Sequence, residues 1–192
     1  MIIILYVMDS LRSDFLSCYG YPKETSPHID QLAREGVLFK NAFAQSTWTR
    51  PSGASLLTST YPSVNGVLTV EDLLPAAIPT LPEQLKKHGF KTIAITSMGN
   101  VSPIYGFGRG FDQYIELYRE ERVIEKRKKI RVKSIGKDQY FGVKTEHVPI
   151  ATSEDINEFL FPLIEENREN HLFFFIWSLD THHPYFHRDM EL

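Results

Sequence analysis

Apolar runs alternate along this chain with segments that have helical periodicity. Residues 1–7 form an almost continuous, β-branched apolar run, and a second such run spans 172–179. Continuous runs of this length are typical of strands that are covered on both faces, as in a parallel sheet. Shorter runs at 37–43 and 91–97 predict two further strands.

Helices are predicted between these strands. They share a polar or proline start and span 26–36, 51–58, 80–89 and 153–167. Ser26 is expected to cap the first helix, and Thr80 with Glu83 predicts a capping box. Pro162 is expected to kink or divide the last one, because proline lacks a backbone N–H. Strands that alternate with helices predict an α/β fold with a mostly parallel central sheet flanked by helices.

Length, charge and composition indicate a single domain that neither binds nucleic acid nor spans a membrane. The 192 residues suffice for one domain, and the net charge of −3 gives no reason to expect nucleic-acid binding. The basic stretch at 119–133 is interpreted as part of a solvated surface excursion at about 119–147. The apolar start is too short to span a membrane and lacks the basic region of a signal peptide, so we expect a cytoplasmic protein with no membrane span.

Polar clusters follow two of the apolar runs. Asp9 comes directly after the first run, and Asp180, His182 and His183 follow the run at 172–179. Ligands of open α/β sheets bind at the carboxyl ends of the strands, so these side chains are candidates for one site. Each cluster also has a simpler interpretation, in which the acid caps a helix and the histidines are exposed.

A third candidate is Thr49, which stands just before the predicted helix at 51–58. The N-terminus of a helix offers unpaired N–H groups and the positive end of the dipole, which suits a phosphate or sulfate oxygen. On this segment alone, the interpretation of Thr49 as a simple helix cap is favoured.

Together these segments resemble the sulfatase family of the alkaline phosphatase superfamily. Motifs similar to those of the family occur in the family's order, at 7–20, 26–33, 49–58, 61–67, 106–112 and 180–185. The resemblance covers nearly the whole chain except the basic stretch. It implies the N-terminal part of a sulfatase-like α/β catalytic domain, and a metal-dependent hydrolase of sulfuric or phosphoric esters.

The resemblance also implies a set of site residues. Asp9 corresponds to a metal-binding aspartate, and Thr49 stands in the position of the nucleophile that bridges metal and substrate. His182 would bind the substrate oxyanion or protonate the leaving group. Arg50 and Asn100 are further substrate-binding candidates, although an Arg50 that points to solvent is an open alternative. The implied cofactor is a divalent cation such as Ca²⁺, Mg²⁺ or Mn²⁺.

Three positions depart from the family's pattern. Thr49 replaces the cysteine or serine that is converted to formylglycine, Gly53 replaces an arginine, and Ser10 replaces a second aspartate. Threonine is not converted, so no formylglycine is expected. An unmodified hydroxyl must form an ester that water then cleaves, which favours phosphate mono- or diesters over sulfate esters.

The family's remaining metal ligands have no counterpart in these 192 residues. Two alternatives therefore stay open: a phosphoryl-group transferase of the same superfamily, and a truncated, non-catalytic module that binds anions or a partner. The expected partner of the enzyme is a small-molecule sulfate or phosphate ester, and a homo-oligomer is compatible with the sequence.

Overall fold

The computed structural model describes residues 1–128 and 151–183 of the chain. The chain divides into two compact units, one made of Met1–Asp9 with Gln45–Leu192 and the other of Ser10–Ala44. The first unit contains the sheet and all five predicted site residues.

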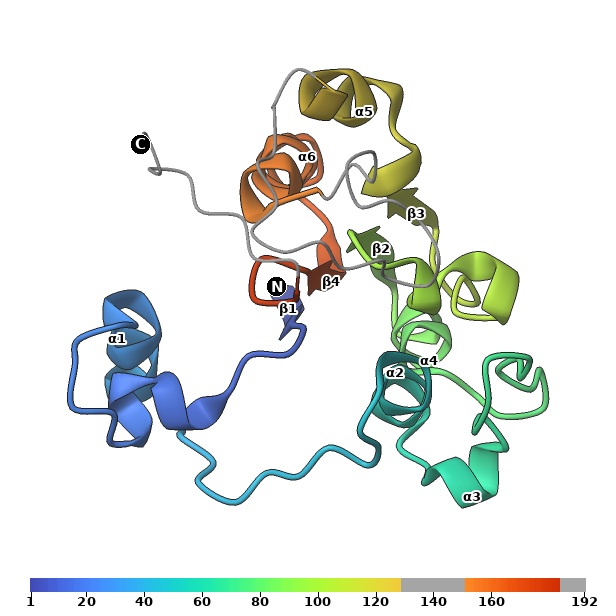
Figure 1. Ribbon diagram of the computed structural model, residues 1–192. Coiled ribbons are helices and arrows are strands. Elements are labelled where there is room, and N and C mark those ends of the chain that lie inside the picture. The colour runs from blue at the N-terminus through green and yellow to red at the C-terminus, as the bar shows by residue number, and fades with distance from the viewer. Residues whose placement is uncertain (129–150, 184–192) are drawn as a thin grey trace. The chain divides into compact units, whose positions relative to one another are not determined.

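The sheet of the first unit has four parallel strands in the order β1-β4-β2-β3 (Figure 1). The strands are β1 (Ile2–Met8), β2 (Phe90–Thr96), β3 (Gln113–Glu116) and β4 (His171–Ser178). The predicted α/β fold with a parallel sheet is therefore confirmed. Strand β3 was not predicted, because four residues with only one buried side chain carry little apolar signal.

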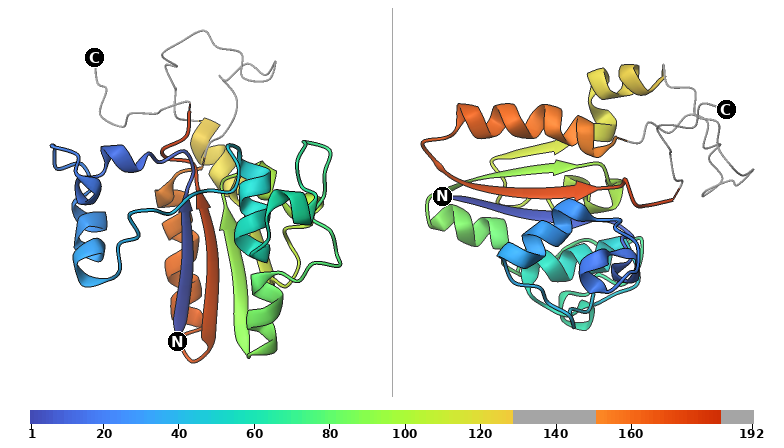
Figure 2. Two further views of the ribbon diagram at one scale, coloured as in Figure 1. Left: turned by 90° about the horizontal axis from the view of Figure 1, so that it is seen from below. Right: turned by 90° about the vertical axis from the view of Figure 1, so that its left-hand side faces the viewer.

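Helices cover both faces of the sheet (Figure 2). Helix α6 (Ser153–Glu166) packs on one face, where α5 (Glu121–Lys128) adds Val123 to the same apolar cluster. Helices α2 (Thr49–Thr58) and α4 (Leu81–Lys87) cover the other face. Strand β4 lies between β1 and β2, and helices cover both of its faces, so its side chains from 172 to 178 are all buried.

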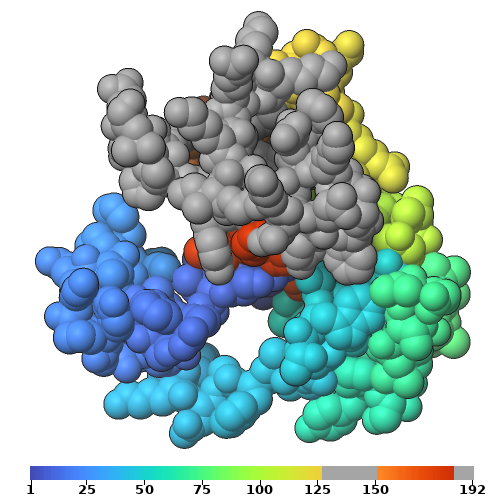
Figure 3. Space-filling view, in the orientation of Figure 1, coloured from blue at the N-terminus to red at the C-terminus, as the bar shows by residue number. Residues whose placement is uncertain are grey.

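Short helices complete the first unit. Helix α3 (Pro62–Asn65) contacts α2, and the two lie side by side in the space-filling view (Figure 3). Three 3₁₀ helices follow strands or loops: η3 (Gly99–Val101), η4 (Pro103–Tyr105) and η5 (Leu117–Arg119). Among the described residues, no helix has the length and apolar character needed to cross a membrane.

The helix start signals were largely correct. Thr80 and Glu83 form the predicted capping box of α4, and Thr152 with Asp155 forms a second one at the start of α6. Pro162 does not divide α6, which runs unbroken from Ser153 to Glu166. The proline is exposed, so the carbonyl that loses its N–H partner lies on the solvent side of the helix.

In the second unit, 3₁₀ helices η1 (Ser13–Phe15) and η2 (Ser17–Tyr19) precede α1 (Pro27–Glu35). Ser26 is the N-cap residue of α1, but its hydroxyl donates to Asp30 Oδ1 at 2.8 Å and caps no N–H group of the helix. The same carboxylate oxygen accepts the N–H of Cys18 at 2.8 Å. Asp30 therefore ties η2 to the start of α1.

Two expectations were wrong. Residues 37–43 form no strand, and Phe43 is 80% exposed, because no neighbouring strand pairs with this segment. Strand β1 is not covered on both faces: every second side chain is exposed, Ile4 at 48%, and β1 lies at the edge of the sheet formed by the described residues. The basic stretch begins as helix α5, whose Lys126 pairs with the buried carboxylate of Asp155 at 3.0 Å. The rest of the proposed excursion, from 129 onward, lies outside the described residues.

Candidate active site at the carboxyl edge of the sheet

The backbone of Asp9 is fixed to the end of the neighbouring strand. Its N–H donates to the carbonyl of Ser178 at 3.0 Å, so the ladder between β1 and β4 continues one residue beyond β1. Its own carbonyl accepts the hydroxyl of Thr181 at 2.7 Å. Asp9 is therefore held at the carboxyl edge of the sheet, where ligands of parallel α/β proteins bind.

The carboxylate of Asp9 joins two other elements. Its Oδ2 accepts the indole N–H of Trp177 on β4 at 2.9 Å and the hydroxyl of Thr49 on α2 at 3.2 Å. The structure thus brings together Asp9 and Thr49, which lie 40 residues apart in the sequence. In the sequence, Trp177 is predicted only as part of a buried strand. A tryptophan next to a polar cluster was the available signal, since a buried indole N–H needs an acceptor.

Thr49 is the first residue of α2 and not its cap. The N-cap residue is Trp48, in an extended conformation with φ −141° and ψ 164°. The interpretation of Thr49 as a simple helix cap is therefore wrong. Its hydroxyl lies in the first turn, where the backbone N–H groups lack partners within the helix. Thr49 is half-buried, and its hydroxyl donates to the carboxylate of Asp9.

Arg50 points into the protein and not to solvent. It is 2% exposed, and its guanidinium lies 3.5 Å from the ring centroid of Tyr105. Nη1 donates to the carbonyl of Val70, and to that of Asp72 at 3.4 Å. Nη2 donates to the side-chain oxygen of Asn100 at 3.2 Å. Two residues predicted separately as substrate contacts are therefore bonded to each other.

The segment that carries Asn100 is itself braced. Asn100 lies in η3, just past the carboxyl end of β2, and the hydroxyl of Tyr114 donates to the carbonyl of Val101 in the same turn. Burial, followed by the nearby Glu116 charge, raises the pKa of Tyr114, so the phenol remains a donor at neutral pH. The Asn100 amide is thereby attached to a fixed backbone.

The cluster after β4 divides into two roles. The carboxylate of Asp180 accepts from the backbone N–H of Ser153 at 3.0 Å and from its hydroxyl at 3.1 Å, so it anchors the start of α6. Nδ1 of His182 contacts the carbonyl of His183. A carbonyl only accepts, so Nδ1 carries the proton and Nε2 is the nitrogen with a lone pair in the neutral ring. Thr181 of this cluster donates its hydroxyl to the backbone carbonyl of Asp9.

Asp9 and Thr49 fit part of the shell of a hard divalent cation. Both supply oxygen atoms, and their 3.2 Å separation matches neighbouring ligands that each lie about 2.0–2.6 Å from one ion. Within the ranges that the structure describes, no group of three or more His, Cys, Asp or Glu side chains is arranged to hold a metal. The oxygen atoms of Asp9 and Thr49 are therefore suitable ligands for a hard divalent cation, and the described residues provide part of its coordination shell.

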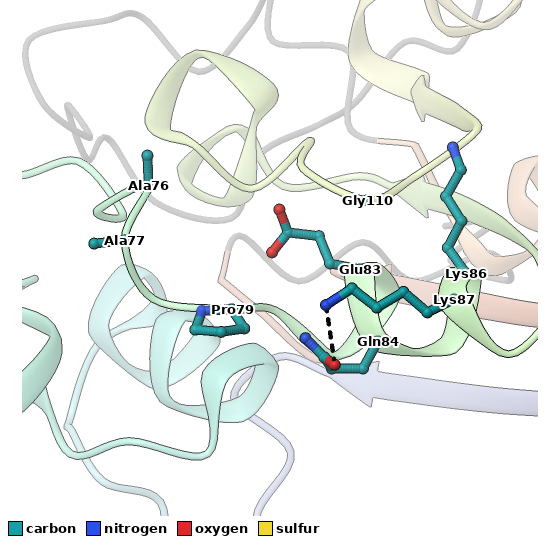
Figure 4. A pocket seen from close by; sticks show the side chains of 8 residues that line it. All are labelled: Ala76, Ala77, Pro79, Glu83, Gln84, Lys86, Lys87 and Gly110. Carbon is teal, nitrogen blue, oxygen red and sulfur yellow. Dashed lines mark hydrogen bonds between the residues drawn. The ribbon is translucent and has the colours of Figure 1, made fainter.

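A pocket of about 430 Å³ lies beside α4 (Figure 4). Its walls are formed by Ala76, Ala77, Pro79, Glu83, Gln84, Lys86, Lys87 and Gly110. Both lysines of the pocket have partners nearby: Lys86 forms an ion pair with Asp112 at 2.5 Å, and Lys87 donates to the side chain of Gln84 at 3.4 Å. None of the predicted site residues lines this pocket.

Comparison with known families supports the resemblance seen in the sequence. A model of the sulfatase family matches residues 2–191. The chain belongs to the sulfatase family. An N-acetylgalactosamine-6-O-sulfatase of Bacteroides thetaiotaomicron is 40% identical over 95 residues, which is 46% of this chain and 19% of that protein. The matched part thus spans about a fifth of this relative's length.

Two solved structures share the fold of this sulfatase-family chain. The phosphonate monoester hydrolase of Agrobacterium radiobacter has a TM-score of 0.70 at 20% identity, with 95% of this chain and 41% of that chain covered. The C-terminal periplasmic domain of EcEptC from Escherichia coli, in complex with zinc, has a TM-score of 0.66 at 17% identity, with coverages of 97% and 46%. The arrangement of strands and helices is therefore shared with both of these proteins.

Proposed function

We propose that the protein carrying this chain hydrolyses phosphoric or sulfuric esters, with phosphate mono- or diesters preferred, and that Thr49 is its nucleophile. The observation that carries the proposal is the hydrogen bond from Thr49 Oγ1 to Asp9 Oδ2 at the start of α2. It places a hydroxyl, a carboxylate and a helix N-terminus at the carboxyl edge of one parallel sheet. Membership of the sulfatase family supports the same reaction class.

The preference for phosphate follows from the chemistry of an unmodified hydroxyl. The Thr49 proton passes to the Asp9 carboxylate as Oγ1 attacks phosphorus, and it returns to Oγ1 when Thr49 is released. A bond from Oγ1 to phosphorus forms as the bond from phosphorus to the alcohol oxygen breaks. Water then attacks the same phosphorus and releases Thr49. The positive end of the α2 dipole, together with backbone N–H groups at the start of this helix, would stabilise the anionic oxygens of the phosphate.

His182 is the proposed proton donor to the departing alcohol. Because Nδ1 donates to the carbonyl of His183, proton exchange runs through Nε2: a His182 that is protonated there gives this proton to the departing alcohol and takes one back from the attacking water. Asn100, held by Arg50, is the proposed contact for a phosphate oxygen. Because its Oδ1 faces the guanidinium, its amide N–H₂ group is the part that can donate to an anion.

Asp9 and Thr49 are the residues that would hold a divalent cation, of the Ca²⁺, Mg²⁺ or Mn²⁺ type. Such an ion would make the Thr49 hydroxyl more acidic and offset the charge of the phosphate. The zinc complex of the EcEptC domain supports metal use in a protein of this fold. The side chains described here do not complete the shell, so the proposal places the other ligands elsewhere in the protein.

Turnover of p-nitrophenyl phosphate, bis-p-nitrophenyl phosphate and p-nitrophenyl sulfate by the whole protein tests this function. Thr49→Ala should abolish turnover and lower stability by only about 1 kcal/mol, the usual value of one hydrogen bond. Thr49→Ser should keep part of the rate, because it retains the hydroxyl. Thr58→Ala is the matched control, since it removes a threonine hydroxyl from the other end of the same helix.

Phosphate esters should be cleaved faster than the sulfate, and co-expression of a formylglycine-generating enzyme should change nothing. Near-normal turnover by Thr49→Ala would remove Thr49 from the mechanism. A sulfate rate that exceeds both phosphate rates would contradict the phosphate preference while leaving the ester hydrolase standing.

A further inference from the structure

Trp177 occupies a special place on the apolar face of β4. It follows Phe173 and Phe175 on the same side of the strand, and it is 4% exposed. A phenylalanine would continue this face with no polar atom. The tryptophan instead adds one N–H at the end of the strand, and that N–H donates to Asp9 Oδ2 at 2.9 Å.

The same ring also contacts the helix that carries Thr49. A Cβ atom added to Gly53 would lie 3.3 Å from Cζ3 of Trp177. The backbone of α2 therefore rests on the indole through a residue that has no side chain. Gly53 comes four residues after Thr49, so the two lie on one face of α2.

We propose that Trp177 is a positioning residue that fixes the separation of Asp9 from Thr49. Its N–H holds one oxygen of the carboxylate and its ring sets how closely α2 approaches the sheet. The inference rests on the proposed function, in which Asp9 and Thr49 hold a divalent cation. A carboxylate anchored at one oxygen does not rotate away from the hydroxyl, so the pair is ready to bind the ion without rearrangement.

Trp177→Phe tests this role in the whole protein, because it keeps most of the ring and removes the N–H. Binding of Mn²⁺ alone, measured by calorimetry, should weaken roughly 10- to 100-fold, which is typical for the loss of a partner that orients a metal ligand. With Mn²⁺ at saturation, kcat should recover toward the unsubstituted value and KM should stay within about twofold, since neither the nucleophile nor the proton donor has changed.

Phe173→Leu is the matched control. Phe173 is a buried aromatic residue on the same face of β4 and stacks on Phe111 with ring centroids 6.2 Å apart. Its truncation should lower the melting temperature but leave the Kd for Mn²⁺ within about twofold. An equal loss of Mn²⁺ affinity in Phe173→Leu would show that Trp177 contributes packing alone.

Asp9→Asn separates this inference from the proposed function. If Asp9→Asn weakens Mn²⁺ binding and Trp177→Phe does not, the positioning role is wrong and the metal role of Asp9 stands. If Asp9→Asn leaves Mn²⁺ binding unchanged, or the unsubstituted protein binds no Mn²⁺, the proposed metal site fails and the inference fails with it. Loss of affinity in both variants, with Phe173→Leu unaffected, supports the positioning role.

Discussion

The guanidinium of Arg50 donates from Nη2 to the side-chain oxygen of Asn100 over 3.2 Å, and this bond joins the start of α2 to the turn after β2. Arg50 reaches the carbonyl of Val70 from its other terminal nitrogen. A lysine has one ammonium group and cannot hold both partners in the same planar geometry. Arg50 is therefore expected to act on the site through Asn100.

Arg50→Lys should reduce stability by about 1–3 kcal/mol, because the buried side chain loses its hydrogen bonds to the carbonyls of Val70 and Asp72. It should also raise KM for a phosphate ester more than it lowers kcat, since the Asn100 amide is no longer oriented. Arg109→Lys is the matched control: Arg109 donates to the carbonyls of Pro75, Ala76 and Ile78, away from the predicted site residues. Denaturant unfolding and steady-state kinetics of both variants check this. Equal KM changes in the two would show that Arg50 is purely structural.

His182 and His183 should differ in their effect on catalysis. His182→Ala should lower kcat/KM roughly 10²- to 10⁴-fold, which is the usual contribution of a positioned proton donor. His183→Ala should have a much smaller effect, because His183 contributes only its backbone carbonyl to the contact with His182, and alanine retains that carbonyl. Kinetics with p-nitrophenyl phosphate and with a poorer leaving group measure the difference. The reverse order of effects would place the proton donor at position 183.

The sequence predicted those parts of the site that depend on local pattern. Asp9 stands after an apolar run and Thr49 before a helix, and both could be identified before any tertiary contact was known. The burial of Arg50 could not, because it results from Tyr105, Val70 and Asn100, which come from three separate segments. The wrong strand at 37–43 has the same origin, since an apolar run becomes a strand only where a partner strand pairs with it.

Asp112 should make stability depend on pH in the acid range. Burial by itself would raise its pKa, but hydrogen bonds from Lys86 and Thr92 outweigh burial and hold the pKa of this carboxyl below its ordinary value. A pKa that is lower in the folded state stabilises the protein above the unfolded value of about 3.9, and this stabilisation is lost as pH falls through the folded value.

Asp112→Asn should therefore lower the urea midpoint at pH 7, and the difference from the unsubstituted protein should shrink toward pH 3. Asp14→Asn removes a carboxylate from an exposed pair with Arg12 and should change the pH 7 midpoint little. Urea unfolding at several pH values measures both. A gap for Asp112→Asn that is constant from pH 7 to pH 3 would contradict the role of its charge.

Gly53→Ala should destabilise the protein even though alanine is the better helix former. In an exposed helix this change would gain about 1 kcal/mol. At position 53 the new Cβ would lie 3.0 Å from Val101 Cγ1 and 3.2 Å from Phe107 Cε1, and both of these side chains are fully buried. Overpacking of a dense core costs about 1–3 kcal/mol, so the net effect should be a lower melting temperature. Gly99→Ala is the matched control, because its Cβ would meet Tyr118 only at 3.8 Å.

Gly53→Ala should also lower the rate of ester hydrolysis. Alanine at position 53 pushes α2 away from Trp177, which lengthens the contact between Thr49 and Asp9. Turnover of Gly53→Ala should therefore fall more than its loss of stability explains at a temperature where the protein is fully folded. Gly53→Arg, which restores the residue of the family motif, should be worse than alanine, because the ring of Trp177 occupies the path of a longer side chain. A more stable and fully active Gly53→Ala protein would show that the contact between position 53 and the Trp177 ring can relax. In that case neither Gly53 nor the Trp177 ring would set the position of α2.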